Sequence, residues 1–310
     1  MRIVFLGSPE FALPALQKLI DDGHEIVGVF TQPDKPAGRG RKLVAPPVKL
    51  LAQEHGLPVF QPKSISKPDS VEQMRALKPE VGVLAAYGQI LRQPVLDVPP
   101  LGILNVHASL LPRWRGAAPI PASILAGDAM TGATIMKVVL ALDAGPMIAA
   151  TEVAIEQDDT TASLTPRVAE AGAALLIDVL PRWADGTLEA APQDDALATY
   201  APQIKKSDAL IAWARDDAET IARMVRAYNP WPVAYTLLDG ALLRILEARP
   251  LGVRSGAPAG TVAVSDVGFC VSTTGHDLAA LRVQPAGKNA MTAREFARGK
   301  RDLNGKMLGS

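Results

Sequence analysis

The stretch Gly102-Ile-Leu-Asn-Val-His-Ala-Ser-Leu-Leu-Pro-Arg-Trp-Arg-Gly116 decides how this chain is organised. Its first part is apolar and mostly branched, which is typical of a strand buried at the centre of a sheet. Asn105 and His107 stand two positions apart within it, so both side chains point to one face of the strand. A buried amide and a buried imidazole are costly unless they have partners or a task. We therefore expect the end of this strand to deliver polar groups to a ligand crevice.

The chain before this stretch has the pattern of a parallel α/β fold. Apolar, strand-like runs recur at 2–7, 25–30, 59–60 and 81–86, and a helix capped by Ser8 is expected between the first two. Strands separated by helices form parallel sheets. The first turn lacks the G-x-G-x-x-G spacing, so it does not predict a dinucleotide site.

After the stretch, the pattern predicts a hairpin, a long helix and then a second domain. Two strands within 131–155 are expected to pair, and 160–186 is expected to be helical. At 310 residues the chain is long enough for about two domains. We place the first domain at 1–186, a linker rich in Ala, Pro and Asp at 187–206, and the second domain at 207–310.

The second domain is predicted to be a small antiparallel barrel. Five short strand-like runs follow residue 232, with Asp239-Gly240 and Thr274-Gly275 as turn signals. Barrels of the oligonucleotide-binding type are built from five such strands. Residues 205–310 hold 15 Lys and Arg against 10 Asp and Glu, a net charge of +5. That excess indicates an anionic partner, although a chance partition of charge would look the same.

Few features point to a membrane, a disulfide or a metal. Cys270 is the only cysteine, so no disulfide framework or four-cysteine metal site is expected. No H-E-x-x-H motif or Cys/His cluster is present. The chain opens directly on a strand, and no apolar run is long enough to span a bilayer. We therefore expect a cytoplasmic protein that uses no metal and contacts no membrane.

His107 is the histidine with the best setting for catalysis, because the other three are expected near helix ends or in a turn. Asp143 lies in Leu-Asp-Ala-Gly-Pro, a tight turn that could aim its carboxylate at His107. Such a carboxylate would fix the tautomer and stabilise the imidazolium, and Asn105 could donate to an oxyanion. No Ser or Cys stands out as a nucleophile, so the trio fits direct acyl transfer. A hydrogen-bonded core histidine would show the same pattern.

The segment 31–49 is expected to be a long, basic loop rich in Pro and Gly. It includes Arg39, Arg41 and Lys42. A loop of this length between neighbouring elements is more often functional than filler, and its basic residues could contact phosphates. A solvated surface insertion is the alternative.

Several longer motifs span nearly the whole chain. They read S-L-L-P-R-W-R-G-A-A-P-I at 109–120, F-T-Q-P-D-K-P-A-G-R-G-R-K-L at 30–43, G-A-T-I-M-K-V with L-D-A-G within 132–145, Y-N-P-W-P at 228–232 and Q-P-A-G-K at 284–288. Together these motifs resemble those of the methionyl-tRNA formyltransferase family, in the same order. The Asn, His and Asp alone would be less specific, because glycinamide ribonucleotide and sugar-amine formyltransferases share them.

The resemblance implies a Rossmann-like, mostly parallel α/β domain followed by a small barrel like the oligonucleotide-binding fold. It also implies formyl transfer from 10-formyltetrahydrofolate to the α-amine of methionyl-tRNA initiator by a monomer. By the motif match, Asn105, His107 and Asp143 are the catalytic residues. The residues implied at the folate site are Tyr87, Gly88, Gln89, Ile90, Leu91, Ser109, Leu110, Leu111 and Pro112. Those implied in tRNA binding are Arg39, Arg41, Lys42, Lys205, Lys206 and Lys288.

Two other functions stay open on the sequence. A formyltransferase acting on a nucleotide-sugar amine would share the trio, although the Arg-rich loop and the basic barrel favour tRNA. An RNA-binding protein with an inactive α/β domain would keep the barrel, but the intact trio argues against it. Arg92 departs from the family pattern, which usually has Pro after Tyr-Gly-Gln-Ile-Leu, and this leaves the local backbone open.

Overall fold

The computed structural model describes residues 1–37, 42–266 and 268–309 of the chain. The chain divides into two compact units. Unit 1 contains Met1–Pro119, Met130–Ala154 and Thr165–Ala201, and unit 2 contains Ile120–Ala129, Ile155–Leu164 and Pro202–Ser310. The sequence pattern placed the first boundary at residue 186. The structure divides the chain differently, because residues 187–201 group with unit 1.

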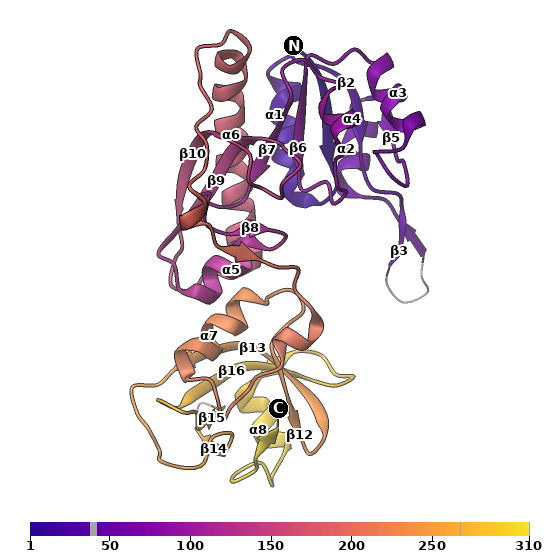
Figure 1. Cartoon of the computed structure of the whole chain (residues 1–310). Coiled ribbons are helices and arrows are strands. Elements are labelled where there is room, and N and C mark those ends of the chain that lie inside the picture. The colour runs from indigo at the N-terminus through magenta and orange to yellow at the C-terminus, as the bar shows by residue number, and fades with distance from the viewer. Residues whose placement is uncertain (38–41, 267, 310) are drawn as a thin grey trace. The chain divides into compact units, whose positions relative to one another are not determined.

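Unit 1 is built on a seven-stranded sheet in the order β10-β9-β7-β6-β1-β2-β5 (Figure 1). The strands from β7 to β5 run parallel, and β9 and β10 are added antiparallel at the other edge. The predicted α/β fold and its hairpin are therefore confirmed. The strands are β1 (Arg2–Gly7), β2 (Glu25–Phe30), β5 (Val59–Phe60), β6 (Val81–Ala85), β7 (Ile103–His107), β9 (Met130–Lys137) and β10 (Met147–Ala154).

Helices cover both faces of this sheet. Val4 of β1 lies in one buried cluster with Val71 and Met74 of α3. On the opposite face Gly172 of α6 lies so close to Val106 of β7 that an added Cβ would come within 2.7 Å of it. The helical segments are η1 (Glu10–Ala12), α1 (Leu13–Asp21), α2 (Pro47–Glu54), α3 (Pro68–Ala76), α4 (Gln93–Leu96) and α6 (Thr161–Ala184), whose first four residues belong to unit 2.

Ser8 does not cap a helix as the sequence pattern predicted. The short η1 precedes α1, and Pro9 stands at its N-cap without a side-chain hydrogen bond. The Ser8 hydroxyl instead donates to the carbonyl of Tyr87 (3.2 Å) and accepts from the backbone N–H of Gln32 (3.0 Å). Ser8 thus joins the segments that follow β1, β2 and β6, at the edge of the sheet where ligands bind in open α/β folds.

The predicted linker has structure of its own within unit 1. β11 (Tyr200–Ala201) pairs in parallel with β8 (Arg115–Gly116), and Met147 forms an antiparallel bridge with Ala191. A short helical turn, η2 (Asp195–Leu197), lies between them. The regular structure of this segment depends on pairing with residues distant in sequence. The weak periodicity of the segment itself could therefore not predict that structure.

Segment 31–49 contains a short antiparallel hairpin of β3 (Lys35–Ala37) and β4 (Lys42–Val44). Lys49 Nζ donates to both carboxylate oxygens of Asp34, at 2.9 and 2.8 Å, and Gln61 Nε2 donates to one of them at 2.7 Å. These hydrogen bonds, that of Gln61 foremost, hold the pKa of Asp34 below its usual value. Lys49 is therefore engaged within unit 1.

Unit 2 is a curled antiparallel sheet in the order β14-β15-β16-β13-β12-β18 (Figure 1). Its two ends meet, because Thr261 bridges Met307 and the N–H of Leu308 donates to the carbonyl of Gly260 at 2.9 Å. This agrees with the predicted barrel. The strands are β12 (Tyr235–Leu238), β13 (Ala241–Pro250), β14 (Val262–Ser265), β15 (Gly268–Val271), β16 (Leu278–Pro285), β17 (Met291–Thr292) and β18 (Leu308–Gly309).

Helices flank this barrel. α7 lies against β13, and α8 lies against β15 and β16. The helical segments are α5 (Pro119–Ala126), η3 (Lys206–Ala209), α7 (Ala218–Ala227) and α8 (Ala293–Gly299). Among the residues that the structure describes, no helix has the length and apolar character needed to cross a membrane.

Candidate active site

β7 places Asn105 and His107 in the interior of the unit 1 sheet. Leu84 of β6 is the register partner of Asn105 on one side, and Met136 and Thr134 of β9 pair with Asn105 and His107 on the other. Both side chains are 6% exposed. Because successive side chains alternate between faces, the amide and the imidazole share one face of the strand, as the sequence predicted.

A backbone carbonyl orients the imidazole of His107. Nε2 lies 2.9 Å from the carbonyl oxygen of Trp114. A carbonyl oxygen only accepts, so Nε2 carries the hydrogen and Nδ1 holds the lone pair of the neutral ring. Trp114 adopts a left-handed conformation, with φ of +62°, in the loop after β7. Trp114 belongs to the motif at 109–120, but nothing in the sequence indicated that the Trp114 backbone would orient His107.

Asp143 approaches the other nitrogen of the ring. Its Oδ1 lies 3.9 Å from Nδ1 of His107, which is too long for a direct hydrogen bond but close enough for the carboxylate to stabilise the ring once it is protonated. Its Oδ2 accepts a hydrogen bond of 2.8 Å from the backbone N–H of Gly116. The Asp143 side chain is 16% exposed, so solvent reaches it only in part. The structure therefore brings all three predicted catalytic residues together.

The side-chain amide of Asn105 differs from its neighbours in having no internal partner. No hydrogen bond joins it to another of the residues described here, although it is buried. A primary amide offers two N–H donors and one carbonyl acceptor. Asn105 therefore presents unused hydrogen-bonding capacity beside His107.

The residues 109–112 are held by hydrogen bonds within unit 1. Ser109 Oγ donates to the carbonyl of Arg113 at 2.6 Å, and Thr134 Oγ1 donates to the carbonyl of Ser109 at 2.7 Å. The N–H of Leu111 donates to the same Thr134 oxygen at 3.1 Å. Ser109 is buried, whereas Leu110 and Pro112 are half-buried. A ligand at this loop would therefore meet Leu110, Pro112 or the backbone rather than the Ser109 hydroxyl.

The second predicted folate loop, 87–91, also directs most of its side chains inward. Tyr87 is 1% exposed, and burial raises the pKa of its hydroxyl far above the usual value. Gln89 accepts from the N–H of Ile65 at 2.7 Å and donates to Pro62 at 3.0 Å. Ile90, by contrast, is 84% exposed. The loop's backbone and Ile90 are what this segment offers to a ligand.

A pocket of about 410 Å³ lies against α4 and the start of β7, in a place the sequence did not predict. Ile103, which lines it, alternates onto the same face of β7 as Asn105 and His107, about 7 and 13 Å along the strand at 3.3 Å per residue. The lining also includes residues just before the Asp143 turn. It consists of Gln93, Leu96, Asp97, Pro99, Pro100, Gly102, Ile103, Lys137, Val138, Val139 and Leu140.

Known proteins match this chain over both units. The profile of the formyl transferase family matches residues 1–180, and that of the formyl transferase C-terminal domain matches 203–301. The methionyl-tRNA formyltransferase of Methylococcus capsulatus is 51% identical over 310 residues, 100% of each chain. That of Chloroflexus aggregans is 48% identical over 301 residues, 96% of this chain and 97% of the relative.

This chain belongs to the methionyl-tRNA formyltransferase family. Solved structures share its fold at lower identity. An N-formyltransferase from Helicobacter canadensis, in complex with folinic acid and dTDP-3-aminofucose, superposes with a TM-score of 0.69 at 16% identity, over 92% of this chain and 99% of that one. HypX from Aquifex aeolicus, in complex with tetrahydrofolic acid, gives a TM-score of 0.62 at 19% identity, over 96% of this chain and 47% of that one.

Arg92, the departure from the usual family pattern, starts α4 as its N-cap in extended conformation. Its backbone N–H donates to Ser66 Oγ at 3.3 Å. A proline at this position would lack that donor. The sequence could not predict the backbone conformation around Arg92. In the structure a hydrogen bond joins this backbone to Ser66, and proline, the usual family residue, could not make that bond.

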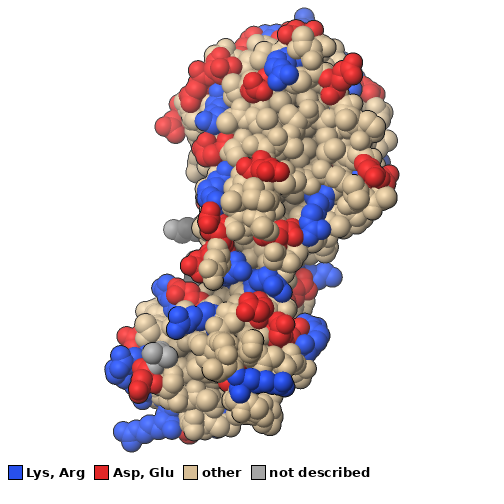
Figure 2. Space-filling view, turned by 90° about the vertical axis from the view of Figure 1, so that its left-hand side faces the viewer, with Lys and Arg blue, Asp and Glu red and all other residues tan. Residues whose placement is uncertain are grey.

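The residues predicted to bind tRNA lie in different surroundings. Arg39, Arg41 and the side chain of Lys42 lie outside the described residues. Lys205 and Lys206 are exposed at the start of η3 in unit 2. On the face of unit 2 drawn in Figure 2, Lys and Arg side chains lie among Asp and Glu side chains rather than in one continuous patch.

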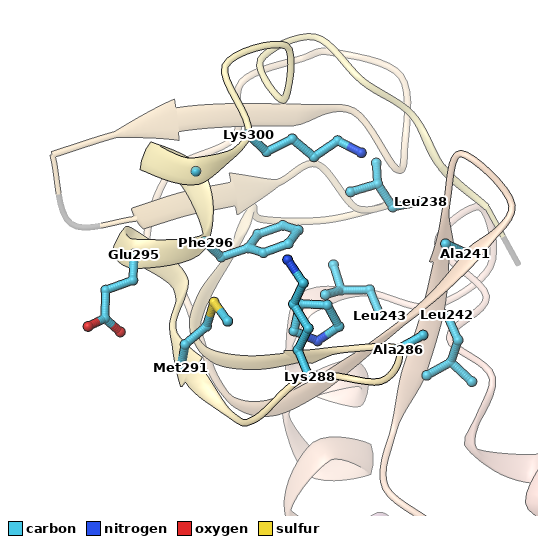
Figure 3. Close-up of a pocket in the computed structure, with 12 residues that line it drawn as sticks. Leu238, Ala241, Leu242, Leu243, Ala286, Lys288, Met291, Glu295, Phe296 and Lys300 are labelled. Atoms are coloured by element: carbon cyan, nitrogen blue, oxygen red, sulfur yellow. The ribbon is translucent and has the colours of Figure 1, made fainter.

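Lys288 lines a pocket of about 310 Å³ in unit 2. Figure 3 shows the side chain of Lys288 in this pocket, which Phe296, Met291 and Leu243 also line. Lys288 forms no ion pair with any described residue, whereas Lys300, across the pocket, lies 2.8 Å from Asp239. The pocket thus combines an apolar floor with one unpaired cation.

Among the described residues, no three His, Cys, Asp or Glu side chains are grouped so that they could hold a metal ion. Cys270 is a free, half-buried cysteine of β15, and burial foremost raises the pKa of its thiol.

Proposed function

We propose that Asn105, His107 and Asp143 catalyse transfer of a formyl group from 10-formyltetrahydrofolate to the α-amine of methionyl-tRNA initiator. The observation that carries this proposal is the convergence of the three groups, with the His107 ring 3.9 Å from the Asp143 carboxylate and the Asn105 amide on the same strand face. The full-length identity of 51% to a methionyl-tRNA formyltransferase supports the choice of substrates.

His107 acts as the general base through Nδ1. An α-amine has a pKa of about 7–8, so much of it is already a neutral nucleophile near neutral pH. When its nitrogen bonds to the formyl carbon, it becomes positively charged, and Nδ1 takes its proton. His107 then returns that proton to the folate nitrogen as the bond from that nitrogen to the formyl carbon breaks. The amine thereby exchanges one hydrogen for the formyl group.

Asn105 and Asp143 stabilise the charges that appear in this exchange. The uncommitted amide hydrogens of Asn105 can donate to the formyl oxygen as it gains negative charge, which typically contributes on the order of 10²–10³ in rate. Asp143 stabilises the imidazolium of His107 by charge, while Gly116 holds its other oxygen. The remaining contribution is proximity, since both reactants must be held in reacting geometry.

The 410 Å³ pocket fits the folate ring system. It lies on the β7 face that leads to Asn105, and its lining combines apolar side chains with the polar groups of Gln93, Asp97 and Lys137. A ring bound there would direct the formyl-bearing nitrogen along the strand toward Asn105. The predicted residues Ile90, Leu110 and Pro112 would then contact the donor outside the pocket.

Basic residues of segment 31–49 and of unit 2 would hold the tRNA. Lys205, Lys206 and Lys288 are exposed in unit 2, and each can pair with a backbone phosphate. Arg39, Arg41 and Lys42 would approach the acceptor end. Since each neutralised phosphate releases counterions, binding should weaken steeply as salt is raised.

We also propose that the chain acts as a monomer in the cytoplasm. All three proposed catalytic groups come from one chain, so a partner subunit is not needed to complete the site. Sedimentation of the purified protein tests the monomer, and cell fractionation tests the compartment.

A formyl-transfer assay tests the reaction and its acceptor. We expect transfer from 10-formyltetrahydrofolate to methionyl-tRNA initiator and none to a nucleotide-sugar amine. Asn105→Ala, His107→Asn and Asp143→Asn should each lower turnover by about 10² or more and leave folate binding largely intact. Near-normal turnover in one of them removes that residue from the mechanism. Transfer to the sugar amine alone would overturn the acceptor.

A further inference from the structure

The segment from Ala191 to Ala201, called the 191–201 segment below, is attached at both ends to the loops that carry the catalytic groups. At one end Ala191 and Met147 exchange two backbone hydrogen bonds of 2.8 Å, just after the Asp143 turn. At the other end β11 pairs with β8, just after Trp114. Two side chains of the segment, those of Gln193 and Thr199, also form hydrogen bonds with the backbone that positions Asp143 and His107.

Gln193 holds the backbone on both sides of the Asp143 turn. Its Nε2 donates to the carbonyl of Asp143 at 2.8 Å and to the carbonyl of Gly145 at 2.7 Å. Asp143 has φ of +47°, in the left-handed region that is costly for a residue with a side chain. At Gly145 a Cβ would lie 1.8 Å from the carbonyl oxygen of Lys137. The turn is therefore strained and closely packed, and one amide fixes two of its carbonyls.

Arg115 fixes the orientation of that amide. Its Nε donates to Gln193 Oε1 at 2.9 Å, which turns Nε2 toward the two carbonyls. The Arg115 side chain is 3% exposed, whereas its second partner, Asp195, is 84% exposed. A buried guanidinium needs acceptors, so Gln193 serves as acceptor for Arg115 and as donor to the turn.

Thr199 holds the peptide that orients His107. Its Oγ1 accepts from the N–H of Trp114 at 2.9 Å, and its carbonyl accepts from the N–H of Arg115 at 2.9 Å. The Trp114 carbonyl, which receives the Nε2 hydrogen of His107, lies between these two bonds. Trp114 is itself in the left-handed region, so its conformation depends on such contacts.

We propose that Gln193 and Thr199 are positioning residues for formyl transfer. Gln193 holds the Asp143 carboxylate at its distance from His107, and Thr199 holds the Trp114 carbonyl that orients the His107 ring. This inference rests on the proposed catalytic roles of His107 and Asp143. Because a displacement of about 1 Å at a reacting centre can cost 10²-fold in rate, such supports should be visible in kcat.

The first test compares substitutions along the segment in the full-length protein. Gln193→Ala should lower kcat about 10- to 100-fold, with little change in KM for methionyl-tRNA. Gln193→Glu should lower kcat similarly, because a carboxylate still accepts from Arg115 but cannot donate to the two carbonyls. Glu189→Gln, the reverse exchange at an exposed position nearby, is the matched control and should leave kcat unchanged. A Gln193→Glu enzyme with normal kcat would overturn the role of Gln193.

The Thr199 arm uses rescue by a conservative change. Thr199→Val keeps the shape of the side chain but lacks the hydroxyl acceptor, and it should lower kcat about 10-fold. Thr199→Ser keeps that acceptor and should restore kcat to within about 2-fold of the wild type. Equal kcat values for the Val and Ser variants would overturn the role of Thr199.

A double-mutant cycle separates positioning from general stability. In an Asp143→Asn background, Gln193→Ala should cost less than about 2-fold in kcat, since the carboxylate that it positions is gone. The same full loss in both backgrounds would mean a structural role and overturn the inference. If Asp143→Asn alone has normal kcat, the proposed mechanism fails, and the inference fails with it. Melting temperature and folate binding of each variant show that it is folded.

Discussion

The active site of unit 1 and the lysine-lined pocket of unit 2 solve different binding problems. In unit 1 the imidazole and the carboxylate are each fixed by a backbone group, Trp114 and Gly116, and the turn that carries Asp143 is fixed again by Gln193. In unit 2 the Lys288 ammonium stands over an apolar floor without an ion-pair partner among the described residues (Figure 3). The imidazole and the carboxylate of unit 1 are therefore held in place, whereas the Lys288 ammonium of unit 2 has no such partner in the part of the chain that the structure describes.

Under the proposed function, the difference follows from what each region would recognise. Charge that develops within a reaction is stabilised best by donors already fixed in place, because they need not reorganise. A polyanion offers many equivalent phosphates, so exposed and mobile cations can bind it without exact geometry. Substitutions in unit 1 should therefore act on turnover, and substitutions in unit 2 should act on affinity and its salt dependence.

The largest effect should come from the unpartnered amide. Asn105→Ala should lower kcat about 10²- to 10³-fold, because it removes the donor to the developing oxyanion. Asn289→Ala, the same exchange at an exposed position beside Lys288, should leave kcat at saturating tRNA unchanged. Single-turnover formylation measures both. Comparable losses of kcat in the two variants would contradict the proposal that unit 1 acts on turnover and unit 2 on tRNA affinity.

A smaller effect is expected at the free cation of unit 2. Lys288→Ala should weaken methionyl-tRNA binding a few-fold and reduce the slope of log affinity against log salt by about 1, with kcat at saturation unchanged. Lys18→Ala in unit 1 removes a lysine that already pairs with Glu170 at 3.4 Å, and it serves as the control. Binding isotherms at several salt concentrations measure the slopes. An unchanged slope for Lys288→Ala would place the tRNA elsewhere.

Tyr87 tests whether a predicted folate residue acts through its side chain. Its hydroxyl is buried and has no hydrogen-bond partner among the described residues. Tyr87→Phe should therefore raise the free energy of unfolding by about 1 kcal/mol and leave folate affinity unchanged. Tyr200→Phe, at a side chain that is 63% exposed, should change neither. Denaturant unfolding and folate titration decide it, and weaker folate binding by Tyr87→Phe would show a direct contact.

The smallest effect is expected at Asp239, the carboxylate that pairs with Lys300 of the unit 2 pocket. Hydrogen bonds from Lys300 (2.8 Å) and Lys306 (3.1 Å) hold the pKa of Asp239 below its ordinary 3.8. A lowered folded-state pKa contributes stability above the unfolded pKa, and that contribution is lost as pH falls through the folded value. Asp239→Asn should thus melt slightly below the wild type at pH 6, and the gap should close below pH 3.8. The effect is small because the group is exposed and screened, and a gap that persists in acid would contradict this origin.

Much of the fold could be predicted because it depends on local pattern. The apolar runs of β1, β2, β6 and β7 stand in the sequence, and so does the change to short strands in unit 2. The placement of Asn105 and His107 on one face of β7 also follows from the alternation of side chains along a strand. The hairpin of β3 and β4 and the pairing of β11 with β8 could not be predicted, because two- and three-residue strands carry no periodicity of their own.

Side-chain identity alone is enough to tell which chemical groups this protein carries and, through its motifs, which family it belongs to. How those groups are held depends on the folded chain. That Trp114 orients His107 through its carbonyl, that Asp143 rests on Gly116, and that Gln193 of the predicted linker supports the Asp143 turn are contacts between residues far apart or between backbone atoms. Every residue type carries the same backbone N–H and C=O, so no side-chain pattern can announce where they will point; the packing of the sheet and its loops settles that.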